Sequence, residues 1–429
     1  MGAQKRQLYW TRLDNAALIF PAAQRRNWSN AFRISVTFRD AVDPALLQQA
    51  VDNCAPRFPS IYVRLRRSAF WYYLEEVGQT PAVREDSCQP LMPMERRDIR
   101  RCAIRVLYYR SRMAVEFFHA VTDGTGGMVF AKTLAAEYVR LRYGADVGAT
   151  HGVLDIRESP KPEELEDSFQ RCAGPLAAPR DDGNVFRYRG TMEPDRFLHV
   201  TLGAVDSDAL LSRSKALGVT ATAWLTAVLL SSLLELQAED VPRRQRRRPV
   251  KVQIPVNLRR LYGGETLRNF VAVANIGVDP RLGDYTLEEL VKLVHHQMHL
   301  NITAKNMQAI FTPNVNSEQN PVLKVVPLFL KNIIMRAVFD TIGERVASMT
   351  LSNLGRVELP EEMAPFVERV EFVLGPQSTG PYNASVTSWG GRTYINIVRN
   401  TVEPRLEEIF FTKLVKLGLH VAVESNDRA

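Results

Sequence analysis

The sequence predicts an α/β protein of two domains. A chain of 429 residues is longer than one hydrophobic core usually supports, so two domains are expected. In both halves, segments that alternate apolar and polar residues, as strands do, are interspersed with segments of helical periodicity. Prolines, glycines and acidic residues become frequent between Leu154 and Arg189, which indicates a connection between domains. We therefore expect an N-terminal lobe over residues 1–155, a linker over 156–190 and a C-terminal lobe over 191–429.

The first half is expected to contain several strands and two main helices. Asp43 and Pro44 are typical of a helix start, with Asp43 as the N-cap and Pro44 in the first turn, and this helix should run to residue 55. A second helix is expected over residues 125–143. β-branched and aromatic residues predict strands over 33–38, 61–65, 69–77, 104–109 and 113–118.

The second half repeats this mixture of strands and helices. Strands are expected over residues 197–202, 250–255, 346–351, 367–373, 383–389 and 393–398. Helices are expected over 207–217, 221–238, 287–304, 323–339 and 403–417.

Composition favours a cytoplasmic protein. Hydrophobic residues make up 45% of the chain and charged residues 24%, as in ordinary globular proteins. Since no apolar run reaches the roughly 20 residues of a membrane span, none is expected. The net charge of +8 arises from a basic excess in residues 1–112, where it is dispersed through strand-like segments, which argues against nucleic-acid binding.

Residues 117–127, Phe-Phe-His-Ala-Val-Thr-Asp-Gly-Thr-Gly-Gly, carry the strongest chemical signal. They follow a predicted strand and open into a predicted helix, so His119 can be held rigidly and still be reached by a substrate. With an unperturbed pKa of about 6.5, imidazole is the side chain best suited to accept a proton at neutral pH. The alternative is a histidine that only satisfies a local turn.

The motif H-x-x-x-D-G of residues 119–124 resembles that of the CoA-dependent acyltransferase superfamily, which includes chloramphenicol acetyltransferase and the condensation domains of peptide synthetases. Residues 253–262, 268–279 and 351–356 resemble further segments of this family, and the stand-alone alcohol acetyltransferase-like members are the most similar in character. The resemblance implies two similar α/β lobes of the chloramphenicol acetyltransferase fold, with a substrate tunnel between them and His119 at its middle. Phe118 stands where many condensation domains have a second histidine, which favours a free-standing enzyme.

The resemblance also implies roles for the residues of the motif. His119 would be the general base, and Asp123 would be structural, paired with Arg259 from the other lobe. Asp123 could equally be a plain helix N-cap, or serve both purposes. Candidate donors to a tetrahedral oxyanion are Ser352, Asn353 and a backbone amide near Gly124, although Ser-Asn-Leu-Gly also suits an ordinary turn.

Two further clusters have competing interpretations. Arg246, Arg247 and Arg248, in an arginine-rich loop, could bind the phosphates of CoA or of a phosphopantetheine arm, or could form a solvated loop. His295 and His299 have a spacing that suits zinc, but without a third ligand we expect a surface helix and no metal.

The expected function is transfer of an acyl group from acyl-CoA to a small alcohol acceptor, with no permanently bound cofactor. One alternative takes the acyl group from acyl-phosphopantetheine on an acyl carrier protein, or delivers it to an amine. Another is a non-catalytic binding or scaffold protein of the same fold.

Overall fold

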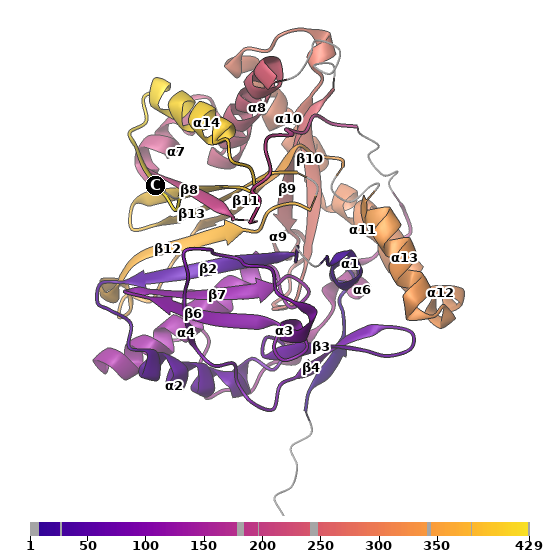
Figure 1. Ribbon diagram of the computed structural model, residues 1–429, viewed down its shortest axis with the longest axis vertical. Helices are drawn as coiled ribbons and strands as arrows, with labels where there is room; N and C mark the ends of the chain where they lie inside the picture. The colour runs from indigo at the N-terminus through magenta and orange to yellow at the C-terminus, as the bar shows by residue number, and fades with distance from the viewer. Residues whose placement is uncertain are drawn as a thin grey trace, which may run out of the picture.

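A computed structural model describes residues 8–25, 28–177, 184–195, 197–240, 248–340, 345–378 and 380–427. Its strands form sheets of three, five and seven strands (Figure 1). The five-stranded and seven-stranded sheets each have their own helices and their own hydrophobic core, and we call them the first and second lobes. The α/β fold class expected from the sequence is confirmed.

The first lobe is built on the sheet β12-β2-β7-β6-β5, in which only β5 and β6 pair in parallel. Helices α2 (Pro44–Cys54) and α4 (Gly124–Tyr143) pack against each other over this sheet. As predicted, Asp43 caps α2, because its carboxylate accepts hydrogen bonds from the amides of Ala45 and Leu46. The strands are β2 (Ala31–Phe38), β5 (Arg84–Glu85), β6 (Ile104–Tyr109), β7 (Arg112–Phe118) and β12 (Val367–Leu374).

The second lobe is built on the sheet β10-β9-β11-β13-β14-β8-β15, where β11 runs parallel to both of its neighbours. The helices α7 (Ser207–Ala216), α8 (Ala221–Asp240), α10 (Leu287–Asn301) and α14 (Arg405–Lys416) cover it (Figure 1). The strands are β8 (His199–Asp206), β9 (Val250–Asn257), β10 (Val271–Val278), β11 (Met349–Arg356), β13 (Tyr382–Trp389), β14 (Arg392–Arg399) and β15 (Val421–Ser425).

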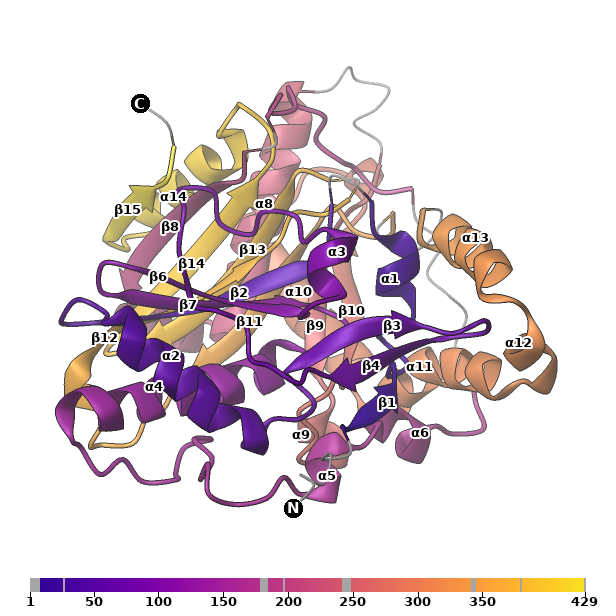
Figure 2. The same ribbon diagram turned by 60° about the horizontal axis from the view of Figure 1, so that its bottom comes forward.

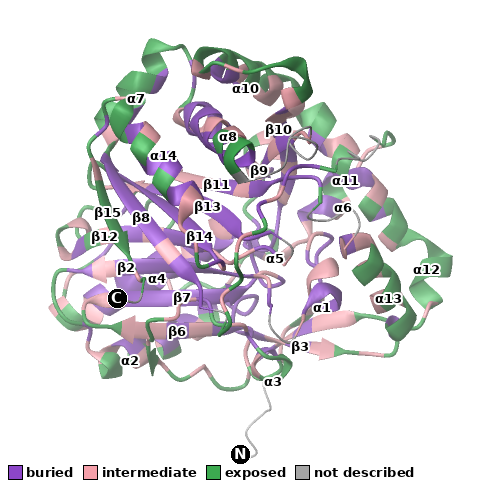
Figure 3. Ribbon diagram, turned by 45° about the horizontal axis from the view of Figure 1, so that its top comes forward, coloured by how far each residue is buried: buried purple, intermediate pink, exposed green. Residues whose placement is uncertain are grey.

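Helix α8 is the centre of the second core. Among the described residues it is the one helix long and apolar enough to cross a membrane, but 67% of its most apolar 18-residue stretch is buried within the protein. Burial of this kind is what a core helix shows, and Figure 3 places α8 among the buried elements.

Strand β12 crosses from the second half of the chain into the first lobe. It pairs with β2 along its length, with Val367 opposite Phe38 and Leu374 opposite Phe32. Hydroxyls of the second sheet reach back to it, since Ser385 Oγ donates to the carbonyl of Phe372 at 2.6 Å. The division at residues 155 and 190 stays a prediction, but the first sheet takes one strand from beyond it.

A third group of elements lies at one side of both lobes. It contains the sheet β1 (Trp10–Arg12), β4 (Tyr72–Glu76) and β3 (Val63–Arg67), the short helix α1 (Ile19–Ala23), and the helices α11 (Ala304–Gln319), α12 (Pro321–Val325) and α13 (Leu328–Val338) (Figure 2). The single helix expected over residues 323–339 was wrong. Pro327 divides it, because a proline has no amide hydrogen and disfavours helical backbone at the preceding residue.

Candidate active site

His119 lies at the junction of the two lobes, one residue beyond the end of β7. Its backbone amide donates to the carbonyl of Asn30 at 2.9 Å, which continues the pairing of β7 with β2 and fixes the residue. The rings of Phe20 from α1 and Phe32 from β2 lie with their centres 5.0 and 5.1 Å from that of the imidazole. The side chain is half-buried, so it is held between aromatic walls and remains accessible.

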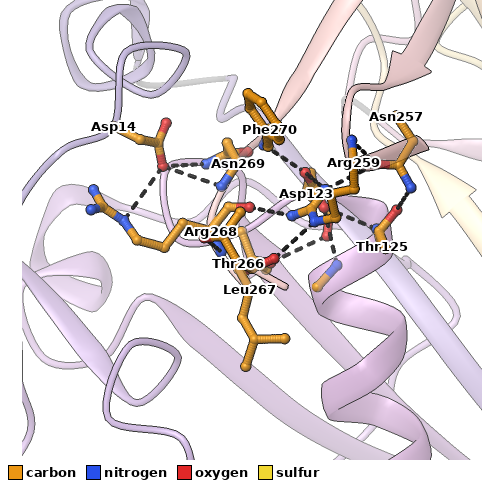
Figure 4. Close-up of polar contacts among 12 residues, drawn as sticks. Asp14, Asp123, Thr125, Asn257, Arg259, Thr266, Leu267, Arg268, Asn269 and Phe270 are labelled. Atoms are coloured by element: carbon orange, nitrogen blue, oxygen red, sulfur yellow. Dashed lines mark hydrogen bonds and ion pairs between the residues drawn. The ribbon is translucent and has the colours of Figure 1, made fainter. Parts of the chain in front are cut away.

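A buried chain of hydrogen bonds determines which nitrogen of His119 carries the proton. Nδ1 of His119 lies 3.1 Å from Oδ1 of Asn269, which belongs to the second lobe. The amide nitrogen of Asn269 donates to the buried carboxylate of Asp14 at 3.0 Å (Figure 4). The oxygen of Asn269 is therefore the atom that faces the imidazole. An amide oxygen can only accept, and Nδ1 must therefore donate. This leaves the lone pair of a neutral imidazole on Nε2, to which no described residue is hydrogen-bonded.

Asp14 is itself held by several donors. Its carboxylate accepts from the backbone amides of Ala17 at 2.9 Å and Asn269 at 3.3 Å, and Arg268 lies 3.9 Å away. Burial raises the pKa of Asp14, and the charge of Arg268 opposes that rise. With these contacts, Asp14 fixes the orientation of the Asn269 amide.

Asp123 and Arg259 form an ion pair across the lobe junction. Nη1 of Arg259, from α9 (Arg259–Tyr262), lies 2.8 Å from Oδ2 of Asp123, and this is the pair named from the sequence. The other oxygen of Asp123 caps α4 by accepting from the amides of Thr125 and Gly126, each at 3.0 Å (Figure 4). Asp123 is fully buried, and the hydrogen bonds of its carboxylate go to Arg259, to the start of α4 and to the amide of Phe270. One carboxylate thus serves as the helix cap and as the anchor for the second lobe.

Gly126 allows the start of α4 to approach the second lobe very closely. A β-carbon at this position would overlap the carbonyl oxygen of Leu267 and the hydroxyl of Thr122. That hydroxyl donates to the same Leu267 carbonyl at 2.6 Å. The motif and residues 266–270 therefore form one tightly packed seam between the lobes.

The three residues named as oxyanion donors lie in different environments. Gly124 is the first residue of α4, and its amide has no hydrogen-bond partner among the described residues, whereas Asp123 accepts from the next two amides. Ser352 in β11 lies opposite Ser385, on the face of the second sheet that meets β12. Asn353 is engaged elsewhere, since its amide nitrogen donates to Thr222 Oγ1 and its oxygen accepts from the amide of Gly355.

The arginines named as phosphate ligands lie apart from this seam. Arg246 and Arg247 fall outside the described residues, and Arg248 is a half-buried residue just before β9. The far end of β9, at Asn257, contacts Thr125 at 3.1 Å. Eight residues of strand separate the two ends by about 25 Å, so Arg248 is remote from His119.

Sequence reasoning missed the partners of His119. Asn269 stands in a segment whose only signal is its resemblance to a family strand, and no motif marks Asp14. Asn269 is 150 residues from His119 in sequence, and no local pattern signals such a contact.

The histidine pair of α10 and the described cavities are not part of the site around His119. His295 and His299 stack on α10, and no group of three side chains able to hold a metal occurs in the part of the chain that the structure describes. Two described cavities, both lined by residues of α1, do not include His119 among their lining residues. The expected tunnel stays a prediction.

No protein-family model and no curated protein sequence matches the chain. Solved structures do match over nearly its whole length. Polyketide synthase associated protein 5 from Mycobacterium tuberculosis superposes with a TM-score of 0.63 at 15% identity, covering 95% of this chain and 97% of that one. TRI101 of F. graminearum, complexed with ethyl coenzyme A, gives a TM-score of 0.63 at 11% identity, covering 98% of this chain and 100% of the other.

The third likeness is to a condensation domain. The first condensation domain of the calcium-dependent antibiotic synthetase superposes with a TM-score of 0.58 at 14% identity, covering 95% of this chain and 96% of that domain. The expected fold, common to CoA-binding acyltransferases and condensation domains, is therefore confirmed.

Proposed function

We propose that the protein is an acyltransferase that moves an acyl group from acyl-CoA to an alcohol, with His119 as the general base. The observation that carries the proposal is the hydrogen bond between His119 Nδ1 and Asn269 Oδ1, because it leaves Nε2 free to accept a proton. The fold supports it, since TRI101 with the same fold is complexed with ethyl coenzyme A.

The reaction needs one base and one site for negative charge. Nε2 of His119 removes the proton of the acceptor hydroxyl as its oxygen attacks the thioester carbonyl. The resulting oxyanion would be stabilised by donors near the motif, for which the amide of Gly124 and the hydroxyl of Ser352 are the candidates. When the intermediate collapses, the carbon–sulfur bond breaks and the imidazolium returns its proton to the CoA thiolate. Asp123 and Arg259 hold the His119 loop in place and take no part in proton transfer.

A carrier-protein donor is the second candidate, because a condensation domain shares the fold. The chemistry at His119 would be the same, with acyl-phosphopantetheine in place of acyl-CoA. In either case the arginines at residues 246–248 are proposed to bind donor phosphates, and amines are the alternative acceptors. If the protein is instead a scaffold, it should bind these ligands without turnover.

Thiol release tests the proposal directly. A panel of acyl-CoAs is mixed with alcohols and amines, and the wild type is compared with His119→Ala and with His299→Ala, an exposed histidine on α10 that serves as the control. We expect acceptor-dependent release that falls at least about a hundredfold in His119→Ala and is unchanged in His299→Ala. Equal rates in His119→Ala and wild type would refute the assigned base. If no acyl-CoA releases thiol, the CoA donor is refuted, and acyl carrier proteins become the donors to test.

A further inference from the structure

Helices α12 and α13 carry an apolar surface that belongs to neither core. Monomeric proteins seldom expose many large apolar side chains on adjacent turns, and such a surface normally contacts something. We call this surface the apolar ridge. It consists of Val322, Leu323, Val325, Phe329, Leu330, Ile333 and Ile334, whose exposed fractions are 71, 43, 69, 65, 42, 65 and 58%.

The tip of the β3–β4 hairpin extends the apolar ridge. The amide of Leu328 donates to the carbonyl of Ala69 at 2.8 Å, so α13 begins against this tip. Phe70 and Trp71 at the tip are also more than a third exposed. Figures 1 and 2 both show α12, α13 and the hairpin tip together at one edge of the molecule, projecting from the lobes. Figure 3 shows most of α12 and α13 as exposed.

The charged side chains on α12 and α13 themselves are all basic. Residues 319–339 contain no aspartate or glutamate but do contain Lys324, Lys331 and Arg336. Arg336 and Arg96 line one cavity of about 410 Å³ between α13 and α1. Asp340 also lines this cavity, but its carboxylate is paired with Arg25. Across the described ranges, with their gaps, none of the three basic residues of α12 and α13, nor Arg96, takes part in an ion pair.

We propose that the apolar ridge docks the protein onto a lipid bilayer with anionic headgroups. An amphipathic helix that lies in a membrane interface combines exposed aliphatic and aromatic side chains with lysines and arginines, as this ridge does. Tryptophan and phenylalanine at a projecting tip suit the same interface, and the basic residues complement anionic lipid.

The shape and charge of the apolar ridge favour a membrane over a second copy of the chain. The ridge projects outward, whereas protein partners of single helices usually offer a groove to receive them. Two copies joined through this ridge would also bring Lys324 and Arg336 of both chains together. The docking does not rest on the proposed acyl transfer, because none of its residues belongs to the machinery around His119.

Vesicle co-sedimentation of the full chain tests the proposal. The vesicles are phosphatidylcholine alone or phosphatidylcholine mixed with phosphatidylglycerol. The double variant Val325→Ser/Phe329→Ser removes two exposed side chains of the apolar ridge. Its matched control, Leu282→Ser/Val415→Ser, removes two apolar side chains that are 82 and 55% exposed and belong to other elements. Lys324→Gln/Arg336→Gln tests the charge.

We expect the wild type to sediment with the anionic vesicles. The ratio of bound to free protein should fall at least about tenfold in the apolar double variant and stay unchanged in its control. Each lost basic residue should lower that ratio about fivefold on anionic vesicles and much less on phosphatidylcholine alone.

Three results would overturn the docking proposal. One is wild-type protein that stays in the supernatant with both kinds of vesicle. Another is an apolar double variant that sediments as the wild type does. The third is a concentration-dependent dimer, seen by light scattering without lipid and lost in the apolar double variant, which would assign the ridge to a second copy.

Discussion

The carboxylate of Asp123 and the guanidinium of Arg259 form a buried ion pair. It positions the two segments that it joins more than it stabilises the fold. Removing two charges from water costs about as much as their attraction returns, so the intact pair adds little to the free energy of folding. Loss of either partner would leave a buried charge unpaired, at a cost of about 3–5 kcal/mol. The pair therefore constrains how residues 119–126 sit against residues 257–270. This explains how a carboxylate that does not contact the imidazole can still matter to it.

Asn269→Ala should impair catalysis by releasing His119. Without the amide oxygen, Nδ1 loses its acceptor, and the imidazole can populate the tautomer in which Nε2 carries the proton and cannot act as a base. We expect kcat/KM to fall about tenfold to a hundredfold, with KM for the acyl donor little changed. Steady-state kinetics over a range of pH measures both quantities.

The control for this prediction is Asn306→Ala, which removes an exposed asparagine of α11 that donates to the carbonyl of Leu300. Circular dichroism should show native secondary structure in both variants. If Asn269→Ala keeps the wild-type rate and pH profile while His119→Ala does not, the proposed positioning role of Asn269 is wrong.

The start of α4 is the element on which the lobe junction depends. Gly126→Ala would place a methyl group against the carbonyl of Leu267, and backbone atoms cannot move aside as flexible side chains can. We expect overpacking to lower the free energy of unfolding by about 1–3 kcal/mol. Because α4 would shift away from Leu267, kcat should fall as well. Urea unfolding and turnover measure the two effects.

Gly78→Ala is the matched control, because a β-carbon there has no atom within 4 Å. Its free energy of unfolding should stay within about 0.5 kcal/mol of the wild type. Equal stability of the Gly126 and Gly78 variants would show that the seam can open without cost.

The elements themselves were largely predictable from the sequence, whereas their contacts were not. Alternation in residues 104–109 and the cap at Asp43 are local signals, and the structure has β6 and α2 at these positions. Helix α11 and strand β15 were not predicted. Helix α11 contains Pro313 and many polar residues, and β15 is an exposed edge strand, so neither has a clear apolar pattern.

The candidate site was also predictable only in part. The motif around His119 is contiguous, and its resemblance to a known family also pointed to Arg259. The hydrogen bonds that link His119, Asn269 and Asp14 depend on how the two lobes pack together, and no local pattern in a single sequence encodes that packing.

Strand β12 interlocks the two lobes. Strand β12 supplies an edge of the first sheet from the second half of the chain, and its Val370 and Phe372 are part of the first core. In addition, residues 257–270 of the second half form hydrogen bonds and an ion pair with the motif at the start of α4. His119 at the junction is therefore held by contacts from both halves of the chain.

This arrangement predicts that the first half of the chain cannot fold alone. A fragment of residues 1–180 would leave the backbone of β2 unpaired where β12 normally lies, and would expose the apolar residues that Val370 and Phe372 cover. We expect this fragment to aggregate or to lack a cooperative unfolding transition, and to copurify with residues 181–429 when the two are coexpressed. Joining residues 357–374 to the fragment through a glycine-rich linker should restore part of the cooperativity, since it returns the missing strand. A fragment 1–180 that unfolds cooperatively, at the midpoint of the full chain, would show that the first lobe is independent and that β12 is dispensable to it.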